Sequence, residues 1–311
     1  MTTATRPRLV FAGAITIDAI ALVGSFPMPD SRQVAHQLAY AGGGPAATAA
    51  VAAARLGADV AMVGAVGQDE EGERAVAALR AEGIDPSGVA AVRGRRTGAS
   101  VILVDAGRGT RAIATRPVPD LELGDTGARL IDAAEWVHAD HLGWRSVHDH
   151  LARTTAKTRL SVDGGNPIAG FTATGADLYV PTVAALEERF GVLSVDDLLV
   201  RAVGDGARVV VATRGAAGSI ALDAEGARHE APGHPVDVIS TLGAGDVFHG
   251  ALLAALAGGL PISAALPYAN VAAALSCRGL DGRSAIPTDA EVRAVLDGPA
   301  PAPPRPAEEA R

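Results

Sequence analysis

The chain has 311 residues, a formal net charge of −8, 48% hydrophobic residues and 20% charged residues. This length allows one large α/β domain or two smaller ones, and the apolar runs are interrupted by Gly, Asp or Arg before they reach the length of a membrane span. An acidic balance without a stripe of Arg and Lys argues against nucleic acid as a partner. We therefore expect a cytoplasmic protein with a small-molecule ligand and no membrane partner.

The predicted elements alternate along most of the chain, with short β-branched runs followed by Ala- and Leu-rich helical stretches. This pattern is typical of a parallel sheet covered by helices on both faces. The expected core strands are residues 9–14, 60–66, 136–139, 160–162, 178–180, 209–212 and 219–222. The expected helices are residues 45–56, 70–82, 147–158, 183–190, 195–204, 244–257, 262–277 and 289–296. Together these elements predict an α/β fold with a three-layer α/β/α core.

Two regions interrupt this alternation. Residues 19–38 and 99–114 indicate antiparallel strand pairs, which we place together as a small β-sheet lid that also offers a homodimer contact. Residues 298–311 are rich in proline and predict a disordered tail. The folded domain is therefore expected to span residues 1–297.

The motif Gly243-Ala244-Gly245-Asp246 lies at the start of the predicted helix 244–257. Its glycines allow a ligand to approach the main chain, and the start of a helix presents unpaired N–H groups to an anion. In such a positive place we expect Asp246 to stay ionised and to accept a proton from an attacking hydroxyl. The alternative is that the glycines only cap the helix and that Asp246 is a favourable first-turn charge.

Lys157 is the only lysine of the chain and lies in a helix-like stretch. The sequence therefore contains neither a Walker-type glycine-lysine loop nor a protein-kinase lysine. The phosphates of ATP would have to be met by backbone amides, arginine and a metal ion, and the sequence assigns no residue to that metal.

A second glycine run, Gly42-Gly43-Gly44, leads into the predicted helix 45–56, which begins with Pro45. It is either a hinge between lid and core or backbone that approaches a polar ligand. Asp18 follows the first strand, at the edge where doubly wound sheets bind ligands. Its carboxylate suits two vicinal hydroxyls, although a turn residue is an equal alternative.

Two further candidates for the substrate carry charge. Arg116, next to the lid hairpin, is a candidate to hold an anionic group, and Asp140 at the end of strand 136–139 is a candidate to face the substrate. The histidines and acids between residues 138 and 150 match no compact zinc pattern.

On the opposite side, Thr213, Gly215 and Gly218 follow strand 209–212 and suit the edge of a nucleotide pocket, although Gly-x-x-Gly is also common in tight turns. Asn270 lies on an otherwise apolar helix. Its amide needs a partner, which is either backbone or an adenosine group.

With both glycine motifs in this order, the chain resembles the ribokinase or PfkB family of small-molecule kinases over about residues 8–297. The resemblance implies a ribokinase-like fold, ATP and Mg²⁺ as cofactors, and often a response to K⁺. It implies that Asp246 is the catalytic base and that Gly243, Ala244 and Gly245 form an anion hole. It also implies sugar contacts from Asp18, Gly42 and Gly43 and an ATP pocket lined by Thr213, Gly215, Gly218 and Asn270.

Within the family, residues 42–57 and 245–251 are most similar to bacterial sulfofructose kinases. Ser240 stands where the family usually has Asp, which argues against a K⁺ site. The leading hypothesis is an ATP-dependent kinase for a ketose such as sulfofructose or fructose. A ribose or nucleoside kinase is the alternative within the family, and a non-catalytic sugar-binding sensor is the alternative from another class.

Overall fold

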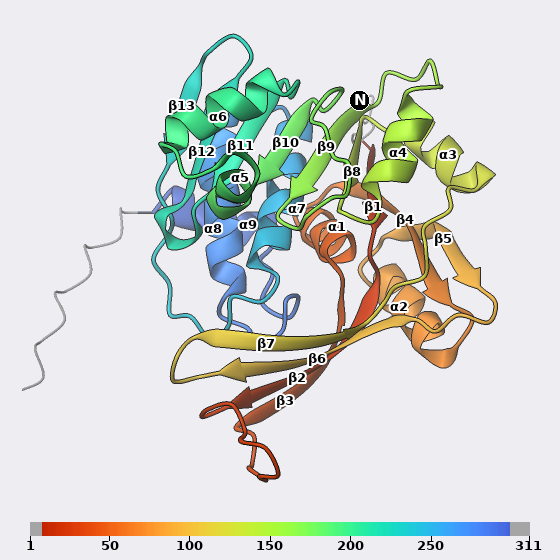
Figure 1. Cartoon of the computed structure of the whole chain (residues 1–311), viewed down its shortest axis with the longest axis vertical. Helices are drawn as coiled ribbons and strands as arrows, with labels where there is room; N and C mark the ends of the chain where they lie inside the picture. The colour runs from red at the N-terminus through yellow and green to blue at the C-terminus, as the bar shows by residue number, and fades with distance from the viewer. Residues whose placement is uncertain (1–7, 299–311) are drawn as a thin grey trace, which may run out of the picture.

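The computed structural model describes residues 8–298 (Figure 1). Apart from Gly298, the tail predicted to be disordered lies outside the described residues. Within residues 8–298, no helix is long and apolar enough to cross a membrane.

A nine-stranded sheet forms the centre of the molecule, in the order β13-β12-β11-β10-β9-β8-β1-β4-β5. Neighbours from β5 to β11 are parallel, whereas β12 and β13 are antiparallel to their neighbours. The strands are β1 Arg8–Gly13, β4 Asp59–Gly67, β5 Asp85–Val92, β8 Trp136–Ala139, β9 Arg159–Gly164, β10 Leu178–Pro181, β11 Val209–Thr213, β12 Ser219–Asp223 and β13 Arg228–Ala231.

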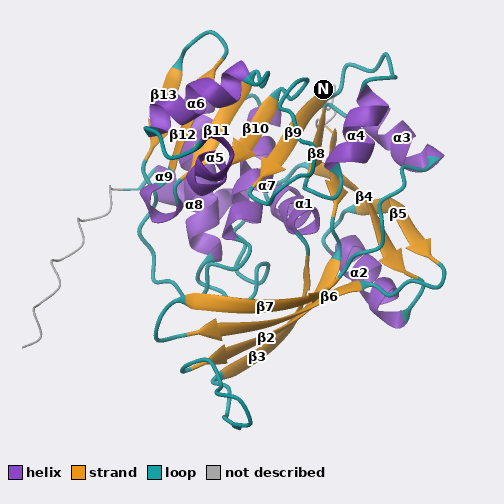
Figure 2. Cartoon of the chain, in the orientation of Figure 1, coloured by secondary structure: helices purple, strands orange, loops and turns teal. Residues whose placement is uncertain are grey.

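Helices cover both faces of this sheet (Figure 2), which confirms the predicted three-layer core. One face packs against α1 Pro45–Arg55, α2 Glu70–Ala81, α7 Ala244–Ala257, α8 Ile262–Ser276 and α9 Asp289–Leu296. The other face packs against α3 Asp125–Asp132, α4 Trp144–Leu151, α5 Val183–Phe190 and α6 Val195–Gly204. A short 3₁₀ turn, η1 Gly215–Ala217, connects β11 to β12.

The sequence prediction missed three elements and misplaced one. β5 is an edge strand that contains Pro86 and Gly88, both of which lower strand propensity. β13 and α3 are short, with only four and eight residues. The helix predicted over residues 147–158 begins earlier, at Trp144, and ends at Leu151, so Lys157 lies in the following loop and not in a helix.

A second sheet lies across one end of the large sheet (Figure 1). It contains β2 Thr16–Val23, β3 Gln37–Gly43, β6 Gly98–Asp105 and β7 Thr110–Arg116, in the order β3-β2-β6-β7. The two predicted antiparallel pairs are joined by parallel pairing of β2 with β6. The inner face of this sheet packs Ile20, Ile102 and Val104 against Leu280, from the segment that follows α8.

Helices α1 and α7 pack closely at Gly250. A Cβ atom at this position would overlap the backbone oxygen of Ala49, so only glycine permits the approach. Glycine at this crossing therefore allows the backbone of α7 to lie directly against the backbone of α1.

Candidate active site

The first turn of α7 presents free backbone amides to an open space. Gly243, the N-cap, has a left-handed φ of 74°, and a side chain there would lie 2.8 Å from the Cα of Gly282. The amide of Ala244 donates to the backbone oxygen of Thr241 at 3.3 Å, whereas those of Gly245 and Asp246 have no partner among the described residues. Because no heavy atom lies within 4 Å of a Cβ placed on Gly245, the turn fits a bound phosphate.

Asp246 is partly exposed at this turn. Burial of its carboxyl, reinforced by the negative charge of Asp163, raises its pKa to about 7, while His249 and Arg283 act in the opposite direction. The expectation that the helix start alone keeps Asp246 ionised is therefore wrong. A carboxyl with a pKa near neutrality is suited to accept a proton from a substrate hydroxyl.

A buried acid–base pair lies close to Asp246. The Nε2 atom of His249 is 3.2 Å from Oδ1 of Asp163, and their side chains are 6% and 5% exposed. Burial would raise the pKa of Asp163, but His249 holds it well below its usual range. In return, although burial opposes the charge of the imidazole, Asp163 raises the pKa of His249. The sequence analysis missed His249, although the three-residue spacing of Asp246 and His249 on one helix was a usable signal.

The predicted sugar-binding residues come together on the small sheet. Asp18 lies within β2, not in a turn after the first strand, and its neighbours Gly42 and Gly43 complete β3, not a hinge. Asp18 is 8% exposed and accepts a hydrogen bond from the Thr16 hydroxyl at 3.0 Å. Burial raises the pKa of Asp18. A Cβ atom on Gly43 would overlap this carboxylate, so glycine lets the backbone lie directly against it.

Arg283 connects the residues predicted to bind sugar with the first turn of α7, and it was not selected from the sequence. Its Nη2 donates to the backbone oxygen of Gly43 at 2.8 Å, and its Nε donates to the Thr48 hydroxyl at 3.2 Å. Its neighbour Gly282 touches Gly243 at the start of α7. Burial lowers the pKa of Arg283 to about 10, so the guanidinium remains charged at neutral pH.

The structure contradicts the substrate role predicted for Asp140. The residue is fully buried, and its Oδ2 accepts hydrogen bonds from the amides of Ala14 at 2.7 Å and Ala46 at 3.3 Å. Its Oδ1 accepts from the amides of Leu142 at 2.9 Å and Gly143 at 3.0 Å. Asp140 therefore joins the end of β1, the start of α1 and the start of α4, and no part of it faces a ligand.

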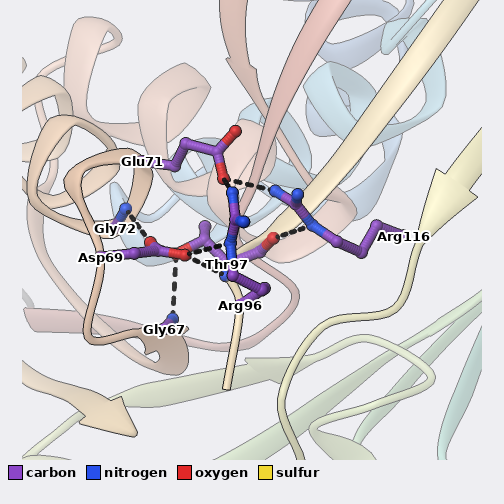
Figure 3. Close-up of polar contacts among 7 residues, drawn as sticks. All are labelled: Gly67, Asp69, Glu71, Gly72, Arg96, Thr97 and Arg116. Carbon is purple, nitrogen blue, oxygen red and sulfur yellow. Dashed lines mark hydrogen bonds and ion pairs between the residues drawn. The ribbon is translucent and has the colours of Figure 1, made fainter. Parts of the chain in front are cut away.

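The structure also contradicts the role predicted for Arg116. Its guanidinium donates to the backbone oxygen of Thr97 at 2.7 Å and forms an ion pair with Glu71 (Figure 3). Arg96 bridges Glu71 and Asp69 at 3.0 and 3.1 Å. These contacts tie the end of β7 to the start of α2. We call Asp69, Glu71, Arg96, Thr97 and Arg116 the lid-root cluster.

On the nucleotide side, the partner of Asn270 is backbone. Its side-chain nitrogen donates to the backbone oxygens of Ala231 at 3.1 Å and Pro232 at 3.0 Å. Gly218, with a φ of 93°, packs against the same segment. Asn270 and Gly218 therefore shape one wall, and of the two partners left open for the Asn270 amide, its nitrogen bonds backbone.

Thr213 and Gly215 lie at the edge of that wall. Thr213 ends β11, and Gly215 is exposed with open space above it and a φ of 58°. Both are accessible to a nucleotide. Among residues 8–298, no group of three or more His, Cys, Asp or Glu side chains is placed to hold a metal ion.

A sequence profile of the pfkB family carbohydrate kinases matches residues 6–159 and 171–289. The chain belongs to this family. It is therefore a phosphotransferase that acts on a sugar hydroxyl.

Relatives within the family act on different sugars. The chain is 28% identical to the ATP-dependent ribose-1-phosphate kinase of Halopiger xanaduensis over 295 residues, covering 93% of this chain and 98% of the relative. It is also 28% identical to fructokinase-1 of Oryza sativa, covering 93% and 97%. The family is thus shared, while the sugar differs between relatives.

Solved structures share the fold. Arabidopsis thaliana ribokinase complexed with ribose and ATP aligns with a TM-score of 0.84 at 21% identity, over 95% of this chain and 100% of that one. Vibrio cholerae fructokinase bound to fructose, ADP and calcium aligns with a TM-score of 0.77 at 23% identity, over 93% and 98%. These alignments confirm the ribokinase-like fold.

Proposed function

We propose that Asp246 is the base that activates the sugar hydroxyl and that the Gly243, Ala244 and Gly245 backbone holds the phosphoryl group in transfer. The observation that carries this proposal is the first turn of α7, where two unpartnered amides and a carboxyl with a pKa near 7 face the same open space.

In this mechanism the sugar lies against Asp18, Gly42 and Gly43, and ATP approaches from Thr213, Gly215 and Gly218. Asp246 takes the proton of the hydroxyl as its oxygen attacks the γ-phosphorus in line, the bond from that phosphorus to the bridging oxygen breaks, and ADP leaves. The amides of α7 stabilise the charge of the transferring group. Mg²⁺, held mainly by the nucleotide and water, would neutralise the phosphates. Ser240 argues against a K⁺ requirement, because its hydroxyl already accepts the Leu242 amide at 3.1 Å.

For the substrate we propose an uncharged ketose, with fructose before sulfofructose. Arg116 is committed to the lid-root cluster, and the charge of Arg283 is offset by Asp18 and Asp246. Because the positive and negative charges of this site already offset each other, an anionic sugar is expected to bind no more tightly than a neutral one. The ribose-1-phosphate kinase relative supports ribose or its phosphate as the second candidate. ADP release measured with fructose, sulfofructose, ribose, ribose 1-phosphate and adenosine distinguishes them.

Replacing Asp246 tests the catalytic proposal. Asp246→Asn removes the proton acceptor while keeping the side-chain shape, so kcat is expected to fall by about 10²- to 10⁴-fold. Calorimetric binding of the sugar is expected to persist. A variant with near-normal kcat would contradict the role of Asp246, and sugar binding by the native protein without any ADP release would favour the sugar-binding sensor.

We also propose a homodimer through the outer face of the small sheet, acting as a lid. Tyr40 and Val101 both flank Ala19 in the strand register, so they share one face. They are 74% and 59% exposed, and Leu38, two residues before Tyr40 on the same strand, is 66% exposed. An apolar face of this kind is expected to be covered by a second copy of the sheet.

A further inference from the structure

His249 is placed to act on Asp246 without touching the substrate. It follows Asp246 by three residues on α7, so both side chains project from the same face of the helix. Its Nε2 pairs with Asp163 on β9, and its Nδ1 is buried without a hydrogen-bond partner among the described residues. An imidazole and a carboxylate are thus withdrawn from water directly behind the proposed base.

Four ionisable groups from four parts of the fold influence the charge of Asp246. Asp163 from β9 and Asp140 from the end of β8 disfavour its ionisation, whereas His249 from α7 and Arg283 from the C-terminal segment favour it. Arg283 stays charged throughout the neutral range. Asp163 raises the pKa of His249 although burial opposes the charge of the ring, and of the two cations only His249 has a side chain whose unperturbed pKa is close to neutral.

A second histidine lies against the pair but carries no charge. The ring centroid of His138 is 5.1 Å from that of His249, and its Nδ1 is 2.9 Å from the Ser161 hydroxyl. Burial lowers the pKa of His138 to about 3. His138 is thus a neutral neighbour of similar size and burial, and it provides a matched control.

We propose that His249 and Asp163 are positioning residues that together set the pH above which Asp246 works as a base. This inference rests on the role of Asp246 proposed above. The imidazolium of His249 offsets the carboxylate of Asp163. Without it, Asp246 would lie near the uncompensated negative charge of the buried Asp163, and a nearby like charge disfavours ionisation.

The test is the pH profile of kcat/KM for His249→Gln and Asp163→Asn. Glutamine keeps a donor for Asp163 and removes the positive charge, so the acidic limb is expected to move upward by about one pH unit. kcat/KM would then fall about tenfold at pH 6 and change little at pH 9. Asp163→Asn removes the negative charge and is expected to move the limb to lower pH.

His138→Gln is the control, because it removes a buried ring without removing charge. The acidic limb of the kcat/KM profile of His138→Gln is expected to stay at the native pH even if the variant melts at a lower temperature. This result would separate an electrostatic effect from a loss of packing. ADP binding by calorimetry and thermal unfolding report whether each variant is folded. If His249→Gln does not fold, Asp163→Asn against His138→Gln still decides the proposal.

Opposite shifts for His249→Gln and Asp163→Asn would support the proposal. A limb that stays in place for either folded variant, or that moves the same way in both, would overturn it. Asp246→Asn keeps the two proposals distinguishable. If Asp246→Asn is inactive at every pH while the acidic limbs of His249→Gln and Asp163→Asn do not move, only the inference about His249 and Asp163 fails. If Asp246→Asn remains active, the proposed role of Asp246 fails.

Discussion

At the scale of single residues, Asp246 shows how two local effects compete. The start of a helix favours a negative charge by about 0.3–1 kcal/mol at an exposed site. Withdrawal from water and the nearby Asp163 act against it and dominate, which raises the pKa of Asp246 to about 7. The local sequence motif indicates only the effect of the helix start, because Asp163 lies far away in the sequence, on β9.

The pH dependence of the native enzyme follows from this balance. Below its pKa Asp246 carries a proton and cannot accept another, so kcat/KM is expected to fall about tenfold per pH unit below about pH 7. Steady-state assays between pH 5 and 9, in buffers of constant ionic strength, measure the limb. A limb near pH 4, the ordinary range of an aspartate, would show that the site does not perturb Asp246.

Arg283 is the residue whose importance is least visible in the sequence. Arg283→Lys keeps the charge but loses the planar group that bonds both Gly43 and Thr48. The KM for the sugar is expected to rise about tenfold, because the backbone of β3 loses a hydrogen bond that holds Gly43 in place. The KM for ATP is expected to change little. The exposed Arg145→Lys is the control. Equal KM values for native and Arg283→Lys proteins would argue against this role.

At the scale of elements, the contact of α1 with α7 depends on the absence of a Cβ atom at Gly250. Gly250→Ala places a methyl group on the backbone oxygen of Ala49, so the free energy of unfolding is expected to fall by about 1–3 kcal/mol. Gly204→Ala, at the end of α6 with no atom within 4 Å of a new Cβ, is expected to stay within about 0.5 kcal/mol of the native protein. Urea unfolding compares them, and equal losses would contradict the packing argument.

The lid-root cluster is a second junction whose contribution to the free energy of unfolding can be measured. Burial alone would raise the pKa of Asp69, but hydrogen bonds from Thr97, Gly72 and Arg96 lower it from 3.8 to about 2. Asp69→Ala is expected to cost about 1 kcal/mol through loss of the α2 cap alone. Because the folded pKa lies below the usual value, the contribution of the carboxylate is present above about pH 4 and is lost as the pH falls toward 2.

Unfolding of Asp69→Ala and native protein at pH 7 and pH 2.5 checks this expectation. The difference between them should shrink at the lower pH. Arg95→Ala is the control, because Arg95 pairs only with the exposed Asp120, at 3.9 Å. A difference that is the same at both pH values would assign the effect to the fold of the turn and not to the carboxylate.

What the sequence predicted depends on how far apart the interacting residues are. Helices α5, α6, α7 and α9 were predicted with their observed bounds, because their periodicity and caps are local. The glycines and Asp246 form one continuous motif for the same reason. The amides of Ala14 and Ala46, which bond Asp140 across the fold, lie 126 and 94 residues away, and Glu71, the ion-pair partner of Arg116, lies 45 residues away. The sequence around Asp140 or Arg116 does not reveal these distant contacts.

At the scale of the whole molecule, the small sheet has two apolar faces and only one is covered. Its inner face packs on Leu280 and Leu242, while Tyr40 and Val101 remain exposed. The double variant Tyr40→Glu and Val101→Glu is expected to convert a dimer into a monomer, measured by light scattering. Val192→Glu, which replaces another highly exposed residue, should leave the mass unchanged. A monomeric native protein would contradict the dimer.

Arg283 also has a consequence for the order in which a nascent chain acquires activity. Among the described residues, every strand of both sheets is complete by Ala231, yet the bond from Arg283 to Gly43 spans 240 residues. A nascent chain that has not yet reached Arg283 can therefore pair all the described strands, but the proposed sugar site still lacks the hydrogen bond from Arg283 to Gly43. Kinase activity is therefore expected to appear only after Arg283 has been synthesised and has bonded the backbone oxygen of Gly43.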